Sequence, residues 1–250
     1  MLPASAPAKP AVPRRRTVGV MAQAVARRRF GLQRFPAVTV VVFAVTAVTS
    51  VLGLALPGLL EALERTAEGL HGDWWRIATA LFVQDGGVAG TVSNLGFLLV
   101  MGALAEQLVG RGLWLVCYFG AGLAGELAGY AWQPRGAGNS VAVCGLAGVL
   151  VVALAAGTQV PRLAPMVVLW WCGALLSLHW GAAPLVVAIV AAMAVQLLPA
   201  LAVPAGRVVA GAAILAAVAL VTARDIHGAA LLAGTVLAAA TRPRWRQTAS

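Results

Sequence analysis

The strongest constraint in this sequence is a series of long apolar segments with almost no charge inside them. Eight such segments follow one another, at residues 37–60, 88–108, 113–132, 140–158, 164–180, 183–202, 207–222 and 226–241. Lipid offers the backbone no hydrogen-bond partners, so each segment satisfies its own amides by coiling as a helix. Apolar residues make up 61% of the chain and charged residues 10%. The sequence therefore predicts an all-α polytopic membrane protein with about eight spans, within a range of six to eight.

The net charge of +10 is placed where it sets the orientation in the membrane, and this excludes nucleic acid as the expected partner. Positive residues near the ends of spans favour the cytoplasmic side. With both termini cytoplasmic, that side carries fourteen of the 18 Lys and Arg residues. The outer side carries the other four and most acidic residues: Arg65, Arg76, Arg135, Arg224, Glu61, Glu64, Glu68, Asp73, Asp85 and Asp225. We therefore expect a basic, disordered N-terminal region at 1–35, a transmembrane domain at 36–241 and a cytoplasmic tail at 242–250.

The loop at 61–87 is predicted to be extracytoplasmic. Its segment HGDWWRIATALF, residues 71–82, is amphipathic and aromatic. This pattern suits a short helix lying at the outer interface, and a plain aromatic belt would give the same pattern. A signal peptide is an alternative for the N-terminus, but the segment at 37–60 is long enough to span and no clear cleavage site follows it.

Few polar residues remain inside the predicted spans, where a polar group without a partner is costly. They are Asn94, Glu106, Gln107, Glu126, Ser140, His179, Gln196 and His227. Three of them, Asn94, Ser140 and His227, lie toward the outer ends of their spans and can share one depth. A histidine can accept the proton of a serine, and an asparagine amide with the serine backbone N–H can stabilise an oxyanion. These residue types fit nucleophilic catalysis.

Structural interpretations of the same residues stay open beside this one. A serine at a helix start is commonly an N-cap, and an asparagine in a span commonly links helices. Glu106 and Gln107 are expected to cap or bridge helices, and His179 is interpreted as an interfacial residue. Asp225 is interpreted as a loop charge, because two residues of separation from His227 on a helix would point the side chains apart.

The stretch GNSVAVCGLAG, residues 138–148, resembles the GxSGxxxGLxG signature of rhomboid intramembrane serine proteases. The matching residues are Gly138, Ser140, Gly145, Leu146 and Gly148. The stretch DIHGAALLAG is similar to the family's AHxxGxxxG motif, with matches at His227 and Gly234. Trp75 and Arg76 resemble the family's first-loop motif, and residues 102–129 resemble the end of its second helix and its third.

The chain departs from the family pattern at four positions. The second-helix HxxxN motif keeps Asn94 but has Gly90 where the histidine belongs, so one expected oxyanion donor is missing. Val141, Ile226 and Ala230 replace smaller residues and add bulk where helices are expected to approach closely. The sequence therefore raises the question whether the serine and the histidine still meet.

The resemblance implies a rhomboid-like helical bundle. Three spans are predicted between Ser140 and His227 where the family usually has one, so residues 163–203 are expected to add a helical hairpin. Because three is odd, the serine and histidine helices still start on the same side of the membrane.

The resemblance also implies hydrolysis of peptide bonds in transmembrane or membrane-adjacent segments of protein substrates. Ser140 would be the nucleophile, His227 the general base and then acid, and Asn94 with the Ser140 N–H the oxyanion donors. A catalytically inactive protein that binds transmembrane clients is the main alternative. A small-solute transporter is a remote one, with Gln196 and Glu126 as candidate path residues.

The partners implied are transmembrane proteins and the lipid bilayer, and the sequence sets no oligomeric state. Cys117, Cys144 and Cys172 lie in apolar segments without metal-ligand spacing, so we expect buried thiols, no metal site and no cofactor. We expect a multi-pass protein of the bacterial plasma membrane with the active site toward the extracytoplasmic side.

Overall fold

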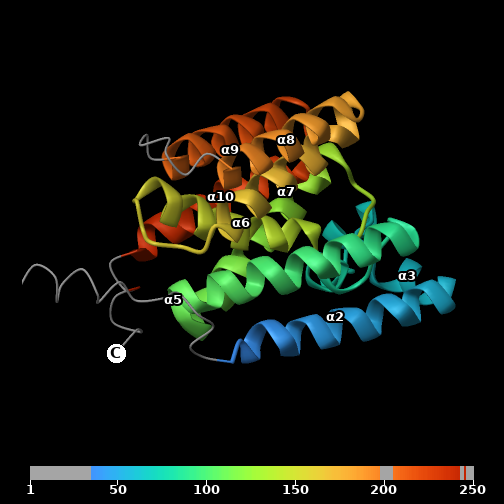
Figure 1. Cartoon of the computed structure of the whole chain (residues 1–250). Helices are drawn as coiled ribbons and strands as arrows, with labels where there is room; N and C mark the ends of the chain where they lie inside the picture. Colours follow the sequence, from blue (N-terminus) through green and yellow to red (C-terminus); the bar gives the residue numbers. More distant parts are fainter. Residues whose placement is uncertain (1–34, 198–204, 243–244, 246–250) are drawn as a thin grey trace, which may run out of the picture. The chain divides into compact units, whose positions relative to one another are not determined.

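The described residues of the computed structural model are 35–197, 205–242 and 245, all within one compact unit, Leu32–Ser250. These residues form helices and no strands, which confirms the predicted all-α class (Figure 1). The predicted N-terminal region at 1–35, apart from Phe35, and most of the predicted tail at 242–250 lie outside the described residues.

The long helices follow the predicted apolar segments. They are α2 (Ala37–Ala55), α5 (Gly87–Trp132), α6 (Ser140–Ala155), α7 (Leu163–Trp180), α8 (Ala183–Leu197), α9 (Ala205–Thr222) and α10 (Ile226–Thr241). By length and hydropathy α2, α5, α7 and α9 can each cross a membrane, while α6, α8 and α10 are apolar but shorter. The chain is thus a multi-pass integral membrane protein.

The long helix α5 is two helices joined at Gly110, as the sequence predicted with separate spans at 88–108 and 113–132. Gly110 has φ 73° and ψ 174°, a backbone conformation that glycine adopts without steric cost. The chain folds back there. As a result, the Trp114 indole N–H after the break reaches the Gly102 carbonyl before it and donates a hydrogen bond over 3.0 Å. The two parts of α5, with α2 and α6 to α10, account for the eight predicted segments.

Between α2 and α5 the chain makes short helices and turns. They are α3 (Pro57–Leu63), α4 (Arg76–Thr79) and two 3₁₀ turns, η1 (Ala67–Leu70) and η2 (Ala80–Phe82). α2 ends earlier than predicted because a residue before proline avoids helical backbone, and Leu56 has φ −128° and ψ 87°. The amphipathic segment contains only the short helices α4 and η2, with Trp74 and Trp75 exposed beside them.

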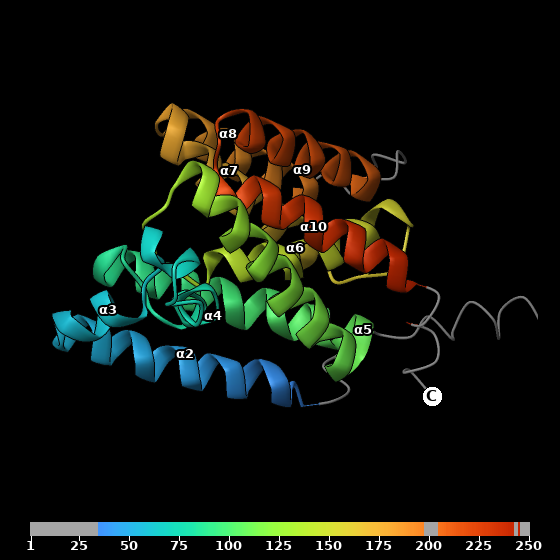
Figure 2. The same cartoon turned by 180° about the vertical axis from the view of Figure 1, so that it is seen from behind.

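Helix α6 lies in the middle of the bundle, with α2 on one side and the α8 and α9 pair on the other, as both views show (Figures 1 and 2). Its residues 141–154 are all buried, and it packs against α5, α10, α9 and α7. α7 and α8 pack against each other as the expected hairpin, and three helices separate Ser140 from His227 as predicted. The helix that Ser140 opens is therefore buried in the bundle, and Ser140 itself is half-buried at its start.

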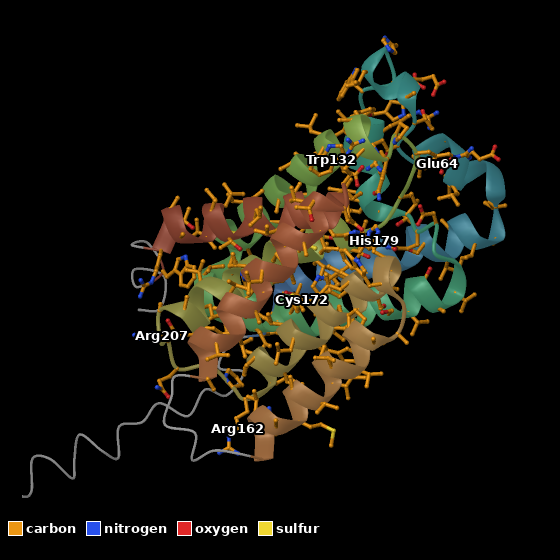
Figure 3. All side chains as sticks on the ribbon, turned by 90° about the horizontal axis from the view of Figure 1, so that it is seen from above. Glu64, Trp132, Arg162, Cys172, His179 and Arg207 are labelled. Carbon is orange, nitrogen blue, oxygen red and sulfur yellow. The ribbon has the colours of Figure 1, made fainter. Side chains whose placement is uncertain are left out.

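The two ends of the bundle differ in charge. Arg162 and Arg207 lie at one end, and Glu64 lies at the opposite end with Trp132 (Figure 3). This separation is the one that the charge pattern predicted, and the end that carries Glu64 is called the Glu64 end below. At the other end Glu106 accepts hydrogen bonds from the Thr39 N–H at 2.9 Å and the Thr39 hydroxyl at 2.8 Å, so it bridges α5 to the start of α2 as expected. The three cysteines are free and buried.

Candidate active site

Ser140 and His227 meet at the Glu64 end of the bundle. Ser140 is the first residue of α6 and His227 the second of α10, so both stand at helix starts. The Ser140 Oγ lies 2.9 Å from the His227 Nε2. This separation is within the range of about 2.6–3.2 Å over which a base can take a proton directly.

Three motif glycines bring the two helices into backbone contact. A Cβ added at Gly148 would lie 2.5 Å from the Gly234 carbonyl carbon, and one at Gly234 would lie 2.5 Å from the Gly145 Cα. Gly145 also faces the Cys117 carbonyl oxygen of α5, which would lie 2.1 Å from an added Cβ. Any side chain at these positions would push α6 and α10 apart, and the serine would move away from the histidine.

The three bulky departures from the family pattern do not separate the helices. Val141, Ile226 and Ala230 gather around Gly125 in the second part of α5. A Cβ at Gly125 would lie 2.4 Å from the Val141 Cγ1, 2.9 Å from the Ala230 Cβ and 3.1 Å from the Ile226 oxygen. The added bulk of Val141 and Ala230 thus lies where helices approach closely, as expected, and the missing side chain of Gly125 leaves room for it. Gly125 lies in the stretch 102–129 that resembles the family's helices, but that resemblance did not mark this role.

Asn94 reaches the serine through a chain of amides. Its Nδ2 donates to the Gln84 Oε1 at 2.8 Å, and the Gln84 Nε2 donates to the Asn139 Oδ1 at 2.7 Å. Asn139 is the residue before Ser140 and is fully buried. Gln84 and Asn139 were missed by the sequence reasoning, since Gln84 lies in the loop before α5 and nothing in its spacing marks it.

The position of Gly138 shows where the polar groups converge. A Cβ there would lie 3.1 Å from the Ser140 Oγ, 3.6 Å from the Gln84 Oε1 and 3.9 Å from the Asn94 Nδ2. These three atoms from three segments of the chain therefore surround one small volume, which glycine leaves unfilled. The motif glycine keeps this volume free next to the serine.

Gly90, which replaces the family's histidine, lies one helical turn before Asn94 and therefore on the same face of α5. A Cβ added at Gly90 has no atom within 4 Å apart from its own helix backbone and neighbours. The position is open, so nothing in the described residues fills the place of the missing donor.

Asp225 does not point away from His227, and the interpretation of it as a loop charge is wrong. It is the N-cap of α10, with extended backbone at φ −96° and ψ 129°, so helical spacing does not apply to it. Its Oδ1 accepts from the His227 N–H at 2.8 Å and lies 2.6 Å from the His227 Nδ1. Its Oδ2 lies 2.5 Å from the Nε2 of His179, which is therefore more than an interfacial residue.

Trp75 and Arg76, the predicted first-loop motif, hold the loop instead of lying at the serine. The Arg76 guanidinium donates to the Asp73 carboxylate at 3.0 Å and to the Glu61 carbonyl at 2.7 Å. Trp75 precedes α4 and is half exposed. The Arg76 contacts tie together distant parts of the loop.

Arg65 ties this loop to the chain segment that leads into Ser140. Its backbone pairs with Gly136 at 2.9 and 3.1 Å, and its buried guanidinium forms an ion pair with Glu126 and donates to the Gln133 carbonyl at 2.7 Å. The Asp85 carboxylate adds a hydrogen bond from the Ala137 N–H at 2.9 Å. The loop and the start of α6 are thus one connected unit.

Residues 71–164 match the family model of the Rhomboid domain. This part of the chain is therefore similar to the Rhomboid domain. The matched range contains Trp75, Arg76, Asn94 and Ser140 and ends before His227. Within the described residues no group of three or more His, Cys, Asp or Glu side chains is placed to hold a metal ion.

One curated relative of this chain is "Rhomboid protease GluP" of Bacillus subtilis (strain 168). It is 35% identical over 82 residues, which cover 32% of this chain and 16% of the relative. The similarity therefore spans less than a fifth of that protein's length, and its activity as a whole does not pass to this chain by similarity alone.

Proposed function

We propose that this protein is an intramembrane serine endopeptidase acting on transmembrane or membrane-adjacent segments of protein substrates. The observation that carries the proposal is the 2.9 Å separation between the Ser140 Oγ and the His227 Nε2. The backbone contact between α6 and α10 at Gly145, Gly148 and Gly234 supports it, because that contact fixes the two helices that carry Ser140 and His227.

The proposed reaction starts when His227 Nε2 takes the Ser140 proton as the Oγ attacks a substrate carbonyl carbon. The oxyanion forms in the volume beside Gly138, where the Asn94 amide and the Ser140 N–H act as donors. His227 then gives its proton to the leaving amine, which breaks the peptide bond and leaves an acyl ester on Ser140. A water molecule, deprotonated by His227, hydrolyses the ester and restores the serine.

The site lies at the Glu64 end, and Arg162 and Arg207 lie at the other (Figure 3). We propose that the Glu64 end faces the extracytoplasmic side, that both termini are cytoplasmic, and that the membrane is the bacterial plasma membrane. A substrate helix would then be cut near its outer end, where its backbone can unwind.

Client binding without cleavage is the second candidate, and the open position at Gly90 favours it. Loss of one oxyanion donor lowers kcat by about 10² to 10³-fold. The small-solute transporter is not supported by its two candidate path residues. Glu126 pairs with Arg65, and Gln196 donates to the Arg162 carbonyl at 2.8 Å.

The test is cleavage of single-span membrane proteins co-reconstituted with the full chain in liposomes. We expect products with the wild type and with Ser177→Ala, whose hydroxyl only bonds its own helix at Ala174. We expect none with Ser140→Ala or His227→Ala. Equal product from the wild type and Ser140→Ala would overturn the protease, and substrate capture without cleavage by both would support client binding.

A further inference from the structure

Four polar side chains form a continuous chain through the site. Ser140 Oγ lies 2.9 Å from His227 Nε2, His227 Nδ1 lies 2.6 Å from Asp225 Oδ1, and Asp225 Oδ2 lies 2.5 Å from His179 Nε2. The four residues come from α6, from the start of α10 and from the end of α7. The serine and histidine are therefore not an isolated pair in this protein.

The carboxylate in the middle of this chain is buried and held rigidly. The Asp225 side chain is 4% exposed, against 13% for His227 and 27% for His179. Its own N–H donates to the Leu220 carbonyl at 2.9 Å, and its carbonyl accepts from Gly228 at 3.1 Å. The carboxylate is thus fixed by its backbone as well as by the two imidazoles.

The residue before Asp225 carries backbone strain. Arg224 has φ 57°, and it is the one residue other than glycine with positive φ in the described part of the chain. Such a conformation is unfavourable for a residue with a Cβ, and it is found where the surrounding structure requires it, often at functional sites. Here it lies in the turn between α9 and α10, directly before Asp225.

The hydrogen-bond chemistry fixes the protonation of both histidines. Burial opposes ionisation of Asp225, but the hydrogen bonds from His227 and His179 outweigh it and hold the pKa of this carboxyl well below its ordinary value. An ionised carboxylate only accepts hydrogen bonds. His227 Nδ1 and His179 Nε2 must therefore donate, which leaves the His227 Nε2 lone pair for the Ser140 hydroxyl.

We propose that Asp225 and His179 are positioning residues that hold His227 in its Nδ1-protonated tautomer, so that the site works as a buttressed Ser–His–Asp triad. The proposal rests on the proposed function of Ser140 and His227. During attack the serine proton moves to His227 Nε2, and Asp225 stabilises the imidazolium without taking a proton. His179 holds the second carboxylate oxygen and gives the α7 and α8 hairpin a role beside the site.

The decisive variant is Asp225→Asn. Asparagine is as good an N-cap as aspartate, so the start of α10 is kept while the carboxylate is lost. If Asp225 only capped the helix, Asp225→Asn would match the wild type and Asp225→Ala would not. For positioning, we expect Asp225→Asn to lower kcat by about 10² to 10⁴-fold, the upper value being that of the same change in a soluble triad protease, with KM within about twofold.

The dependence of kcat on pH distinguishes positioning from capping, because a residue that only caps α10 would leave this dependence unchanged. The titratable groups that face His227 and Asp225 are His179 of α7, Cys144 of α6 and Glu126 of α5, the last paired with Arg65. Because Arg65 offsets Glu126, Asp225→Asn removes the main anion beside the imidazolium. We expect the acid limb of the kcat profile to move to lower pH.

Three matched variants complete the experiment on the full chain in liposomes. His179→Gln should lower kcat by about tenfold, in the range typical of groups that orient a functional histidine. Glu61→Gln and His71→Gln, at exposed positions of the first loop, should leave kcat and the profile unchanged. Wild-type kcat and pH dependence in Asp225→Asn would overturn the proposal.

Histidine ¹⁵N spectra separate this proposal from the proposed function. The chain has 3 histidines, so selective labelling gives few signals. In Ser140→Ala, which has no nucleophile, His227 should still show the Nδ1-protonated tautomer, and Asp225→Asn should weaken that signature. A mixture of tautomers that Asp225→Asn leaves unchanged would contradict the positioning role even if proteolysis fails.

Discussion

The Val141 side chain of α6 occupies the space that a side chain at Gly125 of α5 would need. Substitutions at the two positions can test this packing. Val141 follows the candidate nucleophile directly, so its position sets that of Ser140. In Gly125→Ala the new methyl would lie 2.4 Å from the Val141 Cγ1 and 2.9 Å from the Ala230 Cβ. Ordinary carbon contacts are at about 3.5 Å or more, so the valine has to move by about 1 Å.

The magnitude follows from that displacement. Overpacking by one methyl in a filled core costs about 1–3 kcal/mol of stability. A 1 Å misplacement of a reacting group can cost about 10²-fold in rate. We therefore expect Gly125→Ala to lower the second-order rate of fluorophosphonate labelling by about 10²-fold and to lower the thermal midpoint. Val141→Ala alone should cost about 1–2 kcal/mol of stability by leaving a cavity.

The double variant Gly125→Ala with Val141→Ala carries the test. The methyl introduced by Gly125→Ala then occupies space that the valine side chain has vacated, while its 2.9 Å approach to the Ala230 Cβ remains. Labelling should therefore recover in part, by about tenfold over Gly125→Ala, a coupling of roughly 1–2 kcal/mol by a double-mutant cycle. Gly96→Ala, where a Cβ meets nothing within 4 Å, is the matched control and should label like the wild type. Additive losses in the double variant would refute this packing.

Three further substitutions have defined outcomes. Gly90→His places an imidazole in open space on the face of α5 that carries Asn94. Restoring a second oxyanion donor should raise kcat by up to about 10²-fold. An unchanged kcat in a folded variant would argue against the oxyanion site at this place. Asn94→Ala should lower kcat by about 10² to 10³-fold. Gln84→Ala frees that amide and also leaves the Asn139 side-chain oxygen without the Gln84 donor, and it should lower kcat by about tenfold. A larger effect of Gln84→Ala than of Asn94→Ala on kcat would reverse the two roles. Arg65→Met leaves Glu126 buried without its partner and should destabilise the chain by about 3–5 kcal/mol. Adding Glu126→Gln should restore part of this stability. Thermal unfolding in detergent measures both variants, and an unchanged midpoint in Arg65→Met would contradict the buried pair.

The parts of the fold that were predictable depend on local sequence. Apolar length, proline and glycine punctuation and the basic loops predict the helices and their charged ends, and the motif glycines predict the contact of α6 with α10. These signals act within one segment or through a spacing that repeats along a helix. The start of α6 at Ser140 and the break at Gly110 follow from them.

The rest depends on contacts between distant segments. Gln84 reaches Asn139 across 55 positions of sequence, and His179 reaches Asp225 across 46. Asp225 was misinterpreted because helical spacing was applied to a residue that precedes the predicted span at 226–241. As the N-cap it has extended backbone, and this lets its carboxylate reach His227. The role of Gly125 was not predicted, because within the stretch 102–129 a glycine that leaves room for Val141 and Ala230 looks like any other small residue.

The most direct measurement of the central claim is the mass of the chain after reaction with a fluorophosphonate, with the adduct located by peptide sequencing. The account predicts one adduct per chain on Ser140, loss of the adduct in His227→Ala, and no effect of Ser177→Ala. An adduct on another serine, or no adduct in the folded wild-type chain under conditions that label a known serine hydrolase, would contradict it.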